Sequence, residues 1–273
     1  MFWVRLRSGI ILLAAAVLLL VLGGTVMNIG LLIVSLIGMY ELLKVIGHER
    51  SLLAAMSYGA AVIWFLSFLA DGTDLQAVSE TVRDAVPVIL LLAMLAAYVF
   101  SYPKIHISGP AFCLFVFFYV PVMISYMLRI RGMENGQFLV WLVFISSWGC
   151  DTCAYCAGML FGKHKMAPVL SPKKSVEGAV GGVAGAALIG MIFAMVFRGS
   201  LTVFTAPVPA LMITGAVGAL ISMVGDLAAS AIKRQYTIKD YGTLIPGHGG
   251  IMDRFDSVII TAPLIWYLIC LIR

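Results

Sequence analysis

Residues 206–240 have the sequence APVPALMITGAVGALISMVGDLAASAIKRQYTIKD, an apolar run that passes into a segment rich in charge. Because a run of about 18 or more apolar residues predicts a helix that crosses a membrane, residues 206–231 predict one such helix. Its one carboxylate, Asp226, costs on the order of 3 kcal/mol inside a bilayer, so it needs a partner or a function. The stretch therefore predicts a membrane-spanning helix that brings a carboxylate close to a charged membrane surface.

The same apolar pattern recurs along the whole chain. Hydrophobic residues make up 62% of the sequence and charged residues only 11%, where a soluble globular protein has about 25% charged residues. An ordinary soluble domain is therefore excluded, and the sequence predicts an all-α, polytopic integral membrane helix bundle. We expect about nine transmembrane helices, at residues 8–24, 27–46, 52–70, 85–101, 108–128, 137–160, 176–197, 206–231 and 256–272.

The first apolar run follows two arginines and resembles a signal peptide, but no convincing small-residue cleavage site follows it. We therefore expect it to be retained as a helix. If the N-terminus is cytoplasmic, 13 of the 18 Lys and Arg residues lie in cytoplasmic segments and the other 5 lie outside. The positive-inside rule therefore predicts an N-in/C-out topology. The net charge of +5 fits topology and contact with anionic lipid, and we expect no nucleic-acid partner.

Polar residues divide the chain into two parts. Residues 1–145 are mostly aliphatic and predict N-terminal transmembrane helices that serve as a lipid-facing scaffold. Within the second part, residues 146–273, nearly all the polar groups that look buried fall in residues 146–260. This part predicts C-terminal transmembrane helices with cytoplasmic catalytic loops.

Small residues recur every four positions on the seventh span, at Gly178, Gly182, Ala186 and Gly190. The pattern predicts close helix packing, within the bundle or in a homodimer, and a second interpretation is that N–H groups at the start of this helix face a phosphate. Three cysteines are spaced three apart on the sixth span, at Cys150, Cys153 and Cys156. About 240° of helix separates the first from the third, so we expect small packing residues rather than metal ligands.

Charge is concentrated between Ser230 and Asp256, where seven Asp, Lys and Arg residues fall within 27 positions. Asp226, Ser230 and Lys233 stand at i, i+4 and i+7 and share one face of the predicted helix. Arg234 lies beside them. This face leads from a buried carboxylate to cations that can hold phosphate, and the alternative is an ion pair that only fixes helix packing.

Asp253 and Asp256 lie three positions apart, so both point the same way if a helix begins there. Mg²⁺ usually takes one or two carboxylates together with substrate phosphates, and these two residues with Asp226 predict such a site. The alternative is a solvated loop end in which Arg254 pairs with its neighbours. The preceding PGHGG segment predicts a tight bend, in which His248 is either a structural hydrogen-bonding residue or a donor to phosphate.

Lys173 and Lys174 follow Ser171–Pro172, which predicts a turn at the same membrane surface. Ser175 and Glu177 are then placed to cap the next helix. We expect both lysines to bind phosphate, although basic loops beside a membrane leaflet also attract anionic lipid.

Asp151 lies in the sixth span, close to Thr152 and Tyr155. A carboxylate within a membrane span is by default a candidate for a functional site. A hydrogen bond that packs two helices together is the alternative.

The residues after the eighth span carry a long pattern of chemically distinctive groups, at Ser230, Lys233–Arg234, Lys239–Asp240, Pro246–Gly250, Asp253–Arg254 and Asp256. This pattern resembles the signature of the phosphatidate cytidylyltransferase family, also called CDP-diglyceride synthetases. The segments DTCAYCAG at 151–158 and SPKKSVEG at 171–178 also resemble blocks of that family. The specific match covers about the C-terminal half of the chain, and the N-terminal spans agree only in being apolar.

The resemblance implies a nucleotidyltransferase of phospholipid biosynthesis that makes CDP-diacylglycerol and pyrophosphate from CTP and phosphatidic acid with Mg²⁺. It also implies a monovalent cation such as K⁺, which nothing in the residues themselves indicates. The residues and the resemblance together predict that the catalytic residues are Asp226, Asp253, Lys233 and Arg234. The predicted substrate-binding residues are Ser230, Lys239, Lys173, Lys174, His248 and Asp151, and the predicted metal ligands are Asp226, Asp253 and Asp256.

The predicted location is the bacterial inner membrane with the site facing the cytoplasm, so that CTP arrives from water while the acyl chains stay in the bilayer. A CTP-dependent lipid-alcohol kinase is the main alternative, because it needs the same metal and cations. A CDP-alcohol phosphotransferase is disfavoured, since the chain lacks that family's longer Asp-Gly-x-x-Ala-Arg pattern. A transporter would use Asp226 and Asp151 as an ion path, but the chain shows no visible internal repeat.

Overall fold

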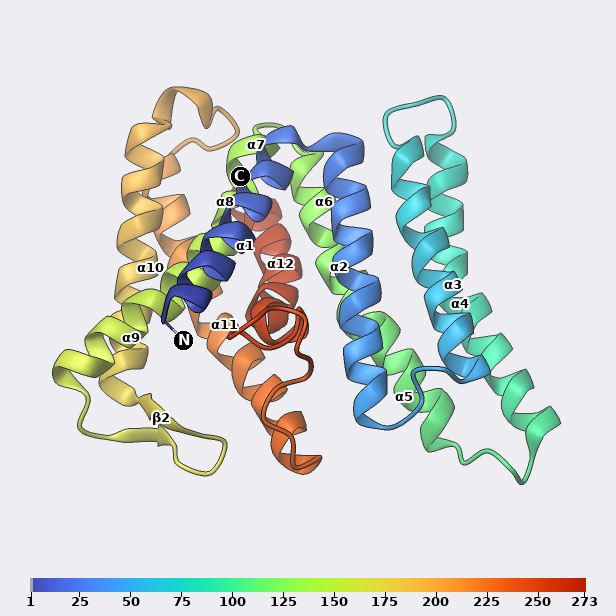
Figure 1. Cartoon of the computed structure of the whole chain (residues 1–273). Helices are drawn as coiled ribbons and strands as arrows, with labels where there is room; N and C mark the ends of the chain where they lie inside the picture. Colours follow the sequence, from blue (N-terminus) through green and yellow to red (C-terminus); the bar gives the residue numbers. More distant parts are fainter. Residues whose placement is uncertain (1) are drawn as a thin grey trace. The chain divides into compact units, whose positions relative to one another are not determined.

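The computed structural model describes the backbone of residues 2–273 and the side chains of residue 3 and residues 7–273. The chain is almost entirely helical (Figure 1). The helices are, in chain order, α1 (Phe2–Leu22), α2 (Gly24–Val45), α3 (Leu52–Ser67), η1 (Phe68–Ala70), α4 (Gln76–Ser101), α5 (Ser108–Phe117), η2 (Phe118–Val122), α6 (Tyr126–Arg131), α7 (Gly136–Leu139), α8 (Trp141–Phe144), η3 (Ile145–Gly149), α9 (Cys150–Phe161), α10 (Val176–Val196), η4 (Arg198–Ser200), α11 (Pro207–Gln235) and α12 (Met252–Ile272). Two short strands, β1 (Lys165–Ala167) and β2 (Ser171–Ser175), form a hairpin between α9 and α10. The predicted all-α architecture is confirmed.

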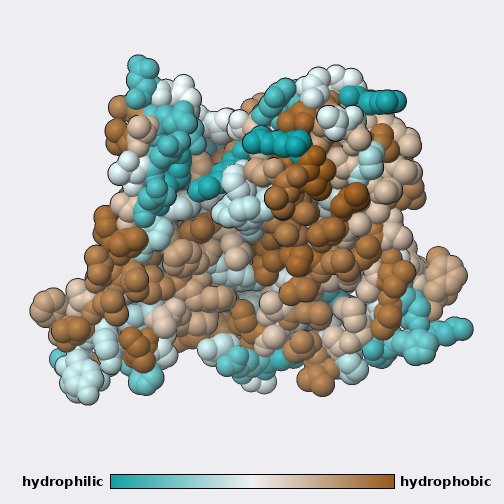
Figure 2. All heavy atoms as spheres, turned by 180° about the vertical axis from the view of Figure 1, so that it is seen from behind, coloured by the Kyte–Doolittle hydropathy of each residue, from teal (hydrophilic) through white to brown (hydrophobic). Residues whose placement is uncertain are grey.

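Among the described residues, eight helical segments are long and apolar enough to cross a membrane, which confirms a polytopic integral membrane protein. They correspond to the second to ninth predicted spans. The first predicted span is also helical, but its apolar stretch, Arg7–Leu22, is shorter than the others. An N-in/C-out topology requires α1 to cross as a ninth span, so that topology stays a prediction. Apolar residues make up much of the surface in view (Figure 2), as expected for a protein in contact with lipid.

Most helix ends lie close to the predicted ones, but α4 begins at Gln76 instead of residue 85. The first turns of α4 are polar, so no apolar run marks them in the sequence. Arg83 in this extension is buried, forms an ion pair of 2.7 Å with Asp71 and lies 4.5 Å from the centroid of the Phe68 ring. Tertiary contacts therefore stabilise this helix beyond the point where the hydropathy pattern stops.

Two of the spans contain π-helical turns that the sequence pattern did not predict. The turn η2 includes Pro121, whose missing N–H group removes one helical hydrogen bond. The turn η3 ends at Gly149, two residues before Asp151. Such turns are frequent at functional sites, and η3 changes the helical phase just before the first predicted carboxylate of the second half.

The chain forms two compact units. Unit 1 comprises Met1–Leu128 and Tyr241–Met252, and unit 2 comprises Arg129–Asp240 and Asp253–Arg273. All the predicted site residues except His248 belong to unit 2. The functional division predicted after residue 145 rests on where polar residues lie along the sequence, and it stays a prediction.

Within unit 2, α10 packs closely against α9 and α11 (Figure 1). A Cβ on Gly182 would lie 2.9 Å from the sulfur of Cys150, and one on Gly190 would lie 2.6 Å from the carbonyl oxygen of Leu211. The small residues of α10 therefore allow close helix packing, as predicted. Cys150 is fully buried in this contact, which confirms its predicted role as a packing residue.

Candidate active site

The β1–β2 hairpin holds basic residues beside the start of α10. Its turn lies at residues 168–170, so the turn predicted at Ser171–Pro172 is wrong, and these two residues begin β2. The strand ends at Ser175, whose Oγ accepts the N–H of Gly178 at 3.1 Å and caps α10 as predicted. Both predicted phosphate-binding lysines therefore lie on a strand that a helix cap fixes in place.

Glu177 closes the base of this hairpin. Its carboxylate accepts the backbone N–H groups of Lys163 at 3.0 Å and His164 at 3.2 Å, and it lies 2.6 Å from Nδ1 of His164. This closure replaces the reciprocal cap that the sequence predicted, because Glu177 stands two rather than three residues after Ser175.

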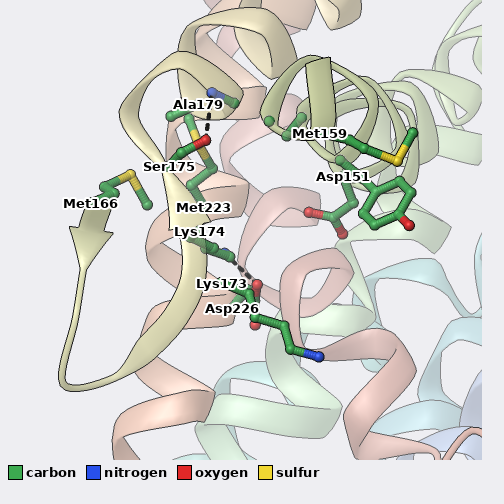
Figure 3. A pocket seen from close by; sticks show the side chains of 13 residues that line it. Asp151, Met159, Met166, Lys173, Lys174, Ser175, Ala179, Met223 and Asp226 are labelled. Atoms are coloured by element: carbon green, nitrogen blue, oxygen red, sulfur yellow. Dashed lines mark hydrogen bonds and ion pairs between the residues drawn. The ribbon is translucent and has the colours of Figure 1, made fainter. Parts of the chain in front are cut away.

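A pocket of about 450 Å³ lies in unit 2 between α9, the hairpin, α10 and α11 (Figure 3). Its polar lining includes Asp151 from α9, Lys173 and Lys174 from β2, and Asp226 from α11. Figure 3 shows the Asp151 carboxylate pointing into the pocket and the ion pair between Lys174 and Asp226. Apolar side chains complete the lining, including Met159, Met166 and Met223. The pocket therefore suits a ligand that has both a charged and an apolar part.

Asp226 is the centre of the polar groups in this pocket. The side chains of Lys174 and Asp226 are 24% and 26% exposed, so their ion pair is partly screened from water. Ser230, one turn further along α11, donates a long hydrogen bond of 3.5 Å to Asp226. Asp151 and Asp256 both lie within electrostatic range of Asp226. The structure thus gathers these predicted residues around one carboxylate, while their roles stay predictions.

Lys233 lies further along α11 and pairs with a different carboxylate. Its Nζ donates to Oδ1 of Asp253 at 2.9 Å, and the two side chains are 15% and 3% exposed. Because α12 begins at Met252, Asp253 lies in its first turn and buried Asp256 follows one turn later. A Cβ on Gly225 would lie 3.2 Å from the carbonyl oxygen of Asp256, so α11 and α12 approach closely at this level. A helix does begin before the two aspartates, four residues earlier than the predicted span, and the alternative of a solvated loop end is wrong.

Three predicted residues lie outside this group. Nε of Arg234 donates to the carbonyl oxygen of Leu170 at 3.4 Å, at the turn of the hairpin. Lys239 is exposed in the segment after α11 and does not line the pocket. His248 belongs to unit 1, where its Nδ1 lies 2.8 Å from Oγ of Ser8. This contact favours the structural interpretation of His248.

Glu41 on α2 is a buried carboxylate of unit 1 that is not among the predicted site residues. It is 5% exposed, and its carboxylate accepts the N–H groups of Ile251 at 3.1 Å and Met252 at 2.8 Å. These two residues lie at the start of α12. The signal was present in the sequence, because Glu41 is a lone carboxylate within an apolar run, which is the criterion that selected Asp226.

The positions of Asp226, Asp253 and Asp256 bear on the predicted metal site. In the part of the chain that the structure describes, no three His, Cys, Asp or Glu side chains form a ready-made metal cluster. Asp226 and Asp256 are nevertheless hard oxygen donors within electrostatic range of each other, and Asp256 is 7% exposed. Mg²⁺ usually takes one or two protein carboxylates and completes its coordination with water and substrate phosphate. Asp226 and Asp253 are each paired with a lysine, so a divalent cation that binds together with its substrate stays a prediction.

Residues 3–272 match the model of the cytidylyltransferase family. The phosphatidate cytidylyltransferase of Bacillus subtilis is 27% identical over 277 residues, which cover 98% of this chain and 97% of that protein. The phosphatidate cytidylyltransferase of Synechocystis is 30% identical over 297 residues, which cover 98% of this chain and 96% of that protein. A third, from Haemophilus influenzae, is 41% identical over 133 residues, or 49% of this chain and 46% of that protein. For two of these relatives, the similarity extends over nearly the whole chain.

Proposed function

Because the chain belongs to the cytidylyltransferase family, we propose that it is an enzyme that transfers CMP from CTP to phosphatidic acid. The products are CDP-diacylglycerol and pyrophosphate. The observation that carries the proposal is the pocket of unit 2, where two lysines and two carboxylates meet apolar side chains beside the ends of membrane-spanning helices. A phospholipid with a charged head and apolar tails is the class of substrate that such a pocket fits.

The reaction needs charge neutralisation more than it needs a base. A phosphate oxygen of phosphatidic acid attacks the α-phosphorus of CTP, a new P–O bond forms, and pyrophosphate leaves with the bridging oxygen. The attacking phosphate monoester is mostly a dianion near pH 7, since its second pKa is about 6, so no strong general base is required. Cations that bring two anions together and hold them in line supply most of the catalysis.

The residues of the pocket are suited to this task. Lys173 and Lys174 line it and are proposed to neutralise the phosphates. Lys233, which Asp253 holds by a hydrogen bond of 2.9 Å, is proposed to add a third cation. The other substrate contacts, proposed from the family signature and the sequence, are Ser230, Arg234, Lys239 and Asp151, whereas the contact of His248 with Ser8 favours a structural role.

Mg²⁺ is the proposed cofactor, with Asp226, Asp253 and Asp256 as its proposed ligands. When bound, Mg²⁺ would supply positive charge to the phosphoryl oxygens during transfer. Asp226 and Asp256 lie within electrostatic range of each other, so a bound cation would offset the repulsion between their like charges. A monovalent cation such as K⁺ stays a prediction from the family resemblance.

We propose that the site faces the cytoplasm at the inner membrane of a bacterium, from the positive-inside rule and the bacterial relatives. CTP would then reach the pocket from the cytoplasm, and the acyl chains of the lipid would stay in the bilayer. A homodimer also stays a prediction.

A product assay tests the proposed function. Purified protein in nanodiscs with labelled CTP, phosphatidic acid and Mg²⁺ is expected to form labelled CDP-diacylglycerol. Formation should stop when a chelator removes Mg²⁺ and resume when Mg²⁺ is added back. A phosphorylated alcohol as the only product would identify a lipid-alcohol kinase instead, and ion flux in liposomes without nucleotide turnover would identify a transporter.

Replacing Lys173 by alanine is expected to raise KM for CTP or phosphatidic acid about tenfold. A hydrogen bond to a charged group contributes about 1.5–3 kcal/mol, and the lower end of that range applies because the Lys173 side chain is exposed to solvent. The midpoint of thermal unfolding should not change. Lys165→Ala is the matched control, since Lys165 is exposed on the facing strand and does not line the pocket. Unchanged kinetics for the Lys173 variant would argue against its contact with phosphate.

A further inference from the structure

The carboxylate of Glu41 is the most deeply buried acidic group of unit 1 whose role the proposed reaction does not explain. Its Oε1 accepts the N–H of Ile251 at 3.1 Å, and its Oε2 accepts the N–H of Met252 at 2.8 Å. Each oxygen thus binds one of two consecutive backbone groups. Because a buried carboxylate without partners is costly, these bonds explain how α2 can hold Glu41 at 5% exposure.

The glycine-rich loop before α12 is shaped around this carboxylate. A Cβ on Gly242 or on Gly250 would collide with the carboxylate of Glu41, which would have to leave its present position to make room. Gly247 and Gly249 have φ angles of 77° and 85°, a left-handed conformation that glycine adopts without strain, and they bend the loop. The group that lies against the backbone of this loop is therefore the carboxylate of Glu41.

The carboxylate of Glu41 places a negative charge at the N-terminus of α12. The first N–H groups of a helix have no partner within the helix, and they carry a partial positive charge that attracts anions. Glu41 binds the first of these groups, at Met252, and the one before it. The next residue of the helix is Asp253, and Asp256 follows one turn later.

We propose that Glu41 is a positioning residue for the cytidylyl transfer reaction, because it binds the first N–H group of α12, the helix that carries Asp253 and Asp256. This inference rests on the proposed function, in which those two aspartates take part in the chemistry. Glu41 itself contacts backbone groups of the loop and acts through the helix that they begin. A group that only stabilised the fold would change the unfolding temperature and leave kcat of the folded enzyme unchanged.

Glu41→Gln tests the proposal, because the amide keeps the shape of the side chain but turns one acceptor into a donor that faces an N–H group. We expect kcat to fall about tenfold or more, since small displacements of catalytic groups have effects of this size. KM for CTP and for phosphatidic acid should stay within about twofold, because no substrate contact is removed. Backbone amides of residues 241–252 should exchange faster with deuterium.

Glu49→Gln is the matched control. Glu49 lies in the connection after α2, in unit 1. The hydrogen bond that the structure describes for it joins its carbonyl oxygen to Tyr58 and not to residues 241–252. Its variant should keep the kcat and the exchange rates of the wild-type protein.

Gly250→Ala is a second variant that leaves Glu41 in place but forces its carboxylate to move. It should lower kcat as Glu41→Gln does, and the double variant should show no further loss, because both changes act on one contact. If wild-type protein makes CDP-diacylglycerol and either variant keeps wild-type kcat and exchange, the role of Glu41 is refuted. If wild-type protein makes no CDP-diacylglycerol, the proposed function fails instead, and the two failures are distinguishable.

Discussion

Changing Asp226 to asparagine is expected to reduce the rate of CDP-diacylglycerol formation about a hundredfold or more, while the protein still inserts and folds. The amide keeps the size of the side chain but removes the negative charge that lies among Lys174, Asp151 and Asp256. If this charge binds a divalent cation, saturating substrate should not restore the rate, and the remaining activity should need more Mg²⁺. Initial rates with labelled CTP over a range of Mg²⁺ concentrations measure both effects.

Two controls separate this role from simpler ones. Asp84→Asn removes an exposed carboxylate from α4 in unit 1 and should leave the rate unchanged. The double variant Lys174→Gln/Asp226→Asn removes both charges of the ion pair. If Asp226 served only to balance Lys174, the double variant would be no less active than Lys174→Gln alone. Near-normal turnover in Asp226→Asn alone would refute the metal role.

Changing Asp253 to asparagine is expected to abolish turnover and also to destabilise the protein. Lys233 and Asp253 are 15% and 3% exposed, so removing one partner leaves a largely buried charge, which costs about 3–5 kcal/mol. The expected result is a loss of rate of about a hundredfold together with a lower midpoint of thermal unfolding.

The double variant Lys233→Gln/Asp253→Asn distinguishes structure from catalysis. With both charges removed, no buried ion is left unpaired, so the unfolding midpoint should recover toward that of the wild-type protein. The rate should stay low, because both groups are proposed to act on the phosphates and the cation. Recovery of the rate together with stability would show that the pair only holds α11 and α12 together.

Local patterns allowed much of the fold and part of the site to be predicted. The spans could be predicted because hydropathy is a property of each segment by itself, and α10 begins and ends within a residue of its predicted bounds. The helical period predicted that Asp226 and Ser230 share a face of α11, and the hydrogen bond between them bears this out. The first turns of α4, from Gln76, could not be predicted from hydropathy, because the ion pair of buried Arg83 stabilises them and no apolar run marks them.

Partners that are distant in the sequence could not be predicted in this way. Lys233 was expected to face substrate, and its bond to Asp253 depends on how α12 returns beside α11 after a loop. The hairpin strands were missed because β2 is rich in polar residues and has no apolar alternation to mark it. Glu41 could be recognised as unusual from its apolar surroundings, but nothing near it in the sequence indicates that its partners are Ile251 and Met252.

The bond between Glu41 and Ile251 joins residues 210 positions apart, which has a consequence for biosynthesis. At about 5–20 residues per second, a ribosome needs roughly 10–40 s to travel from one to the other. During that interval α2 is in the membrane with a carboxylate whose eventual partners do not yet exist, at a cost on the order of 3 kcal/mol. We therefore expect the nascent protein to remain immature until its last helix has been translated, and newly made chains to be most exposed to membrane proteases in this period.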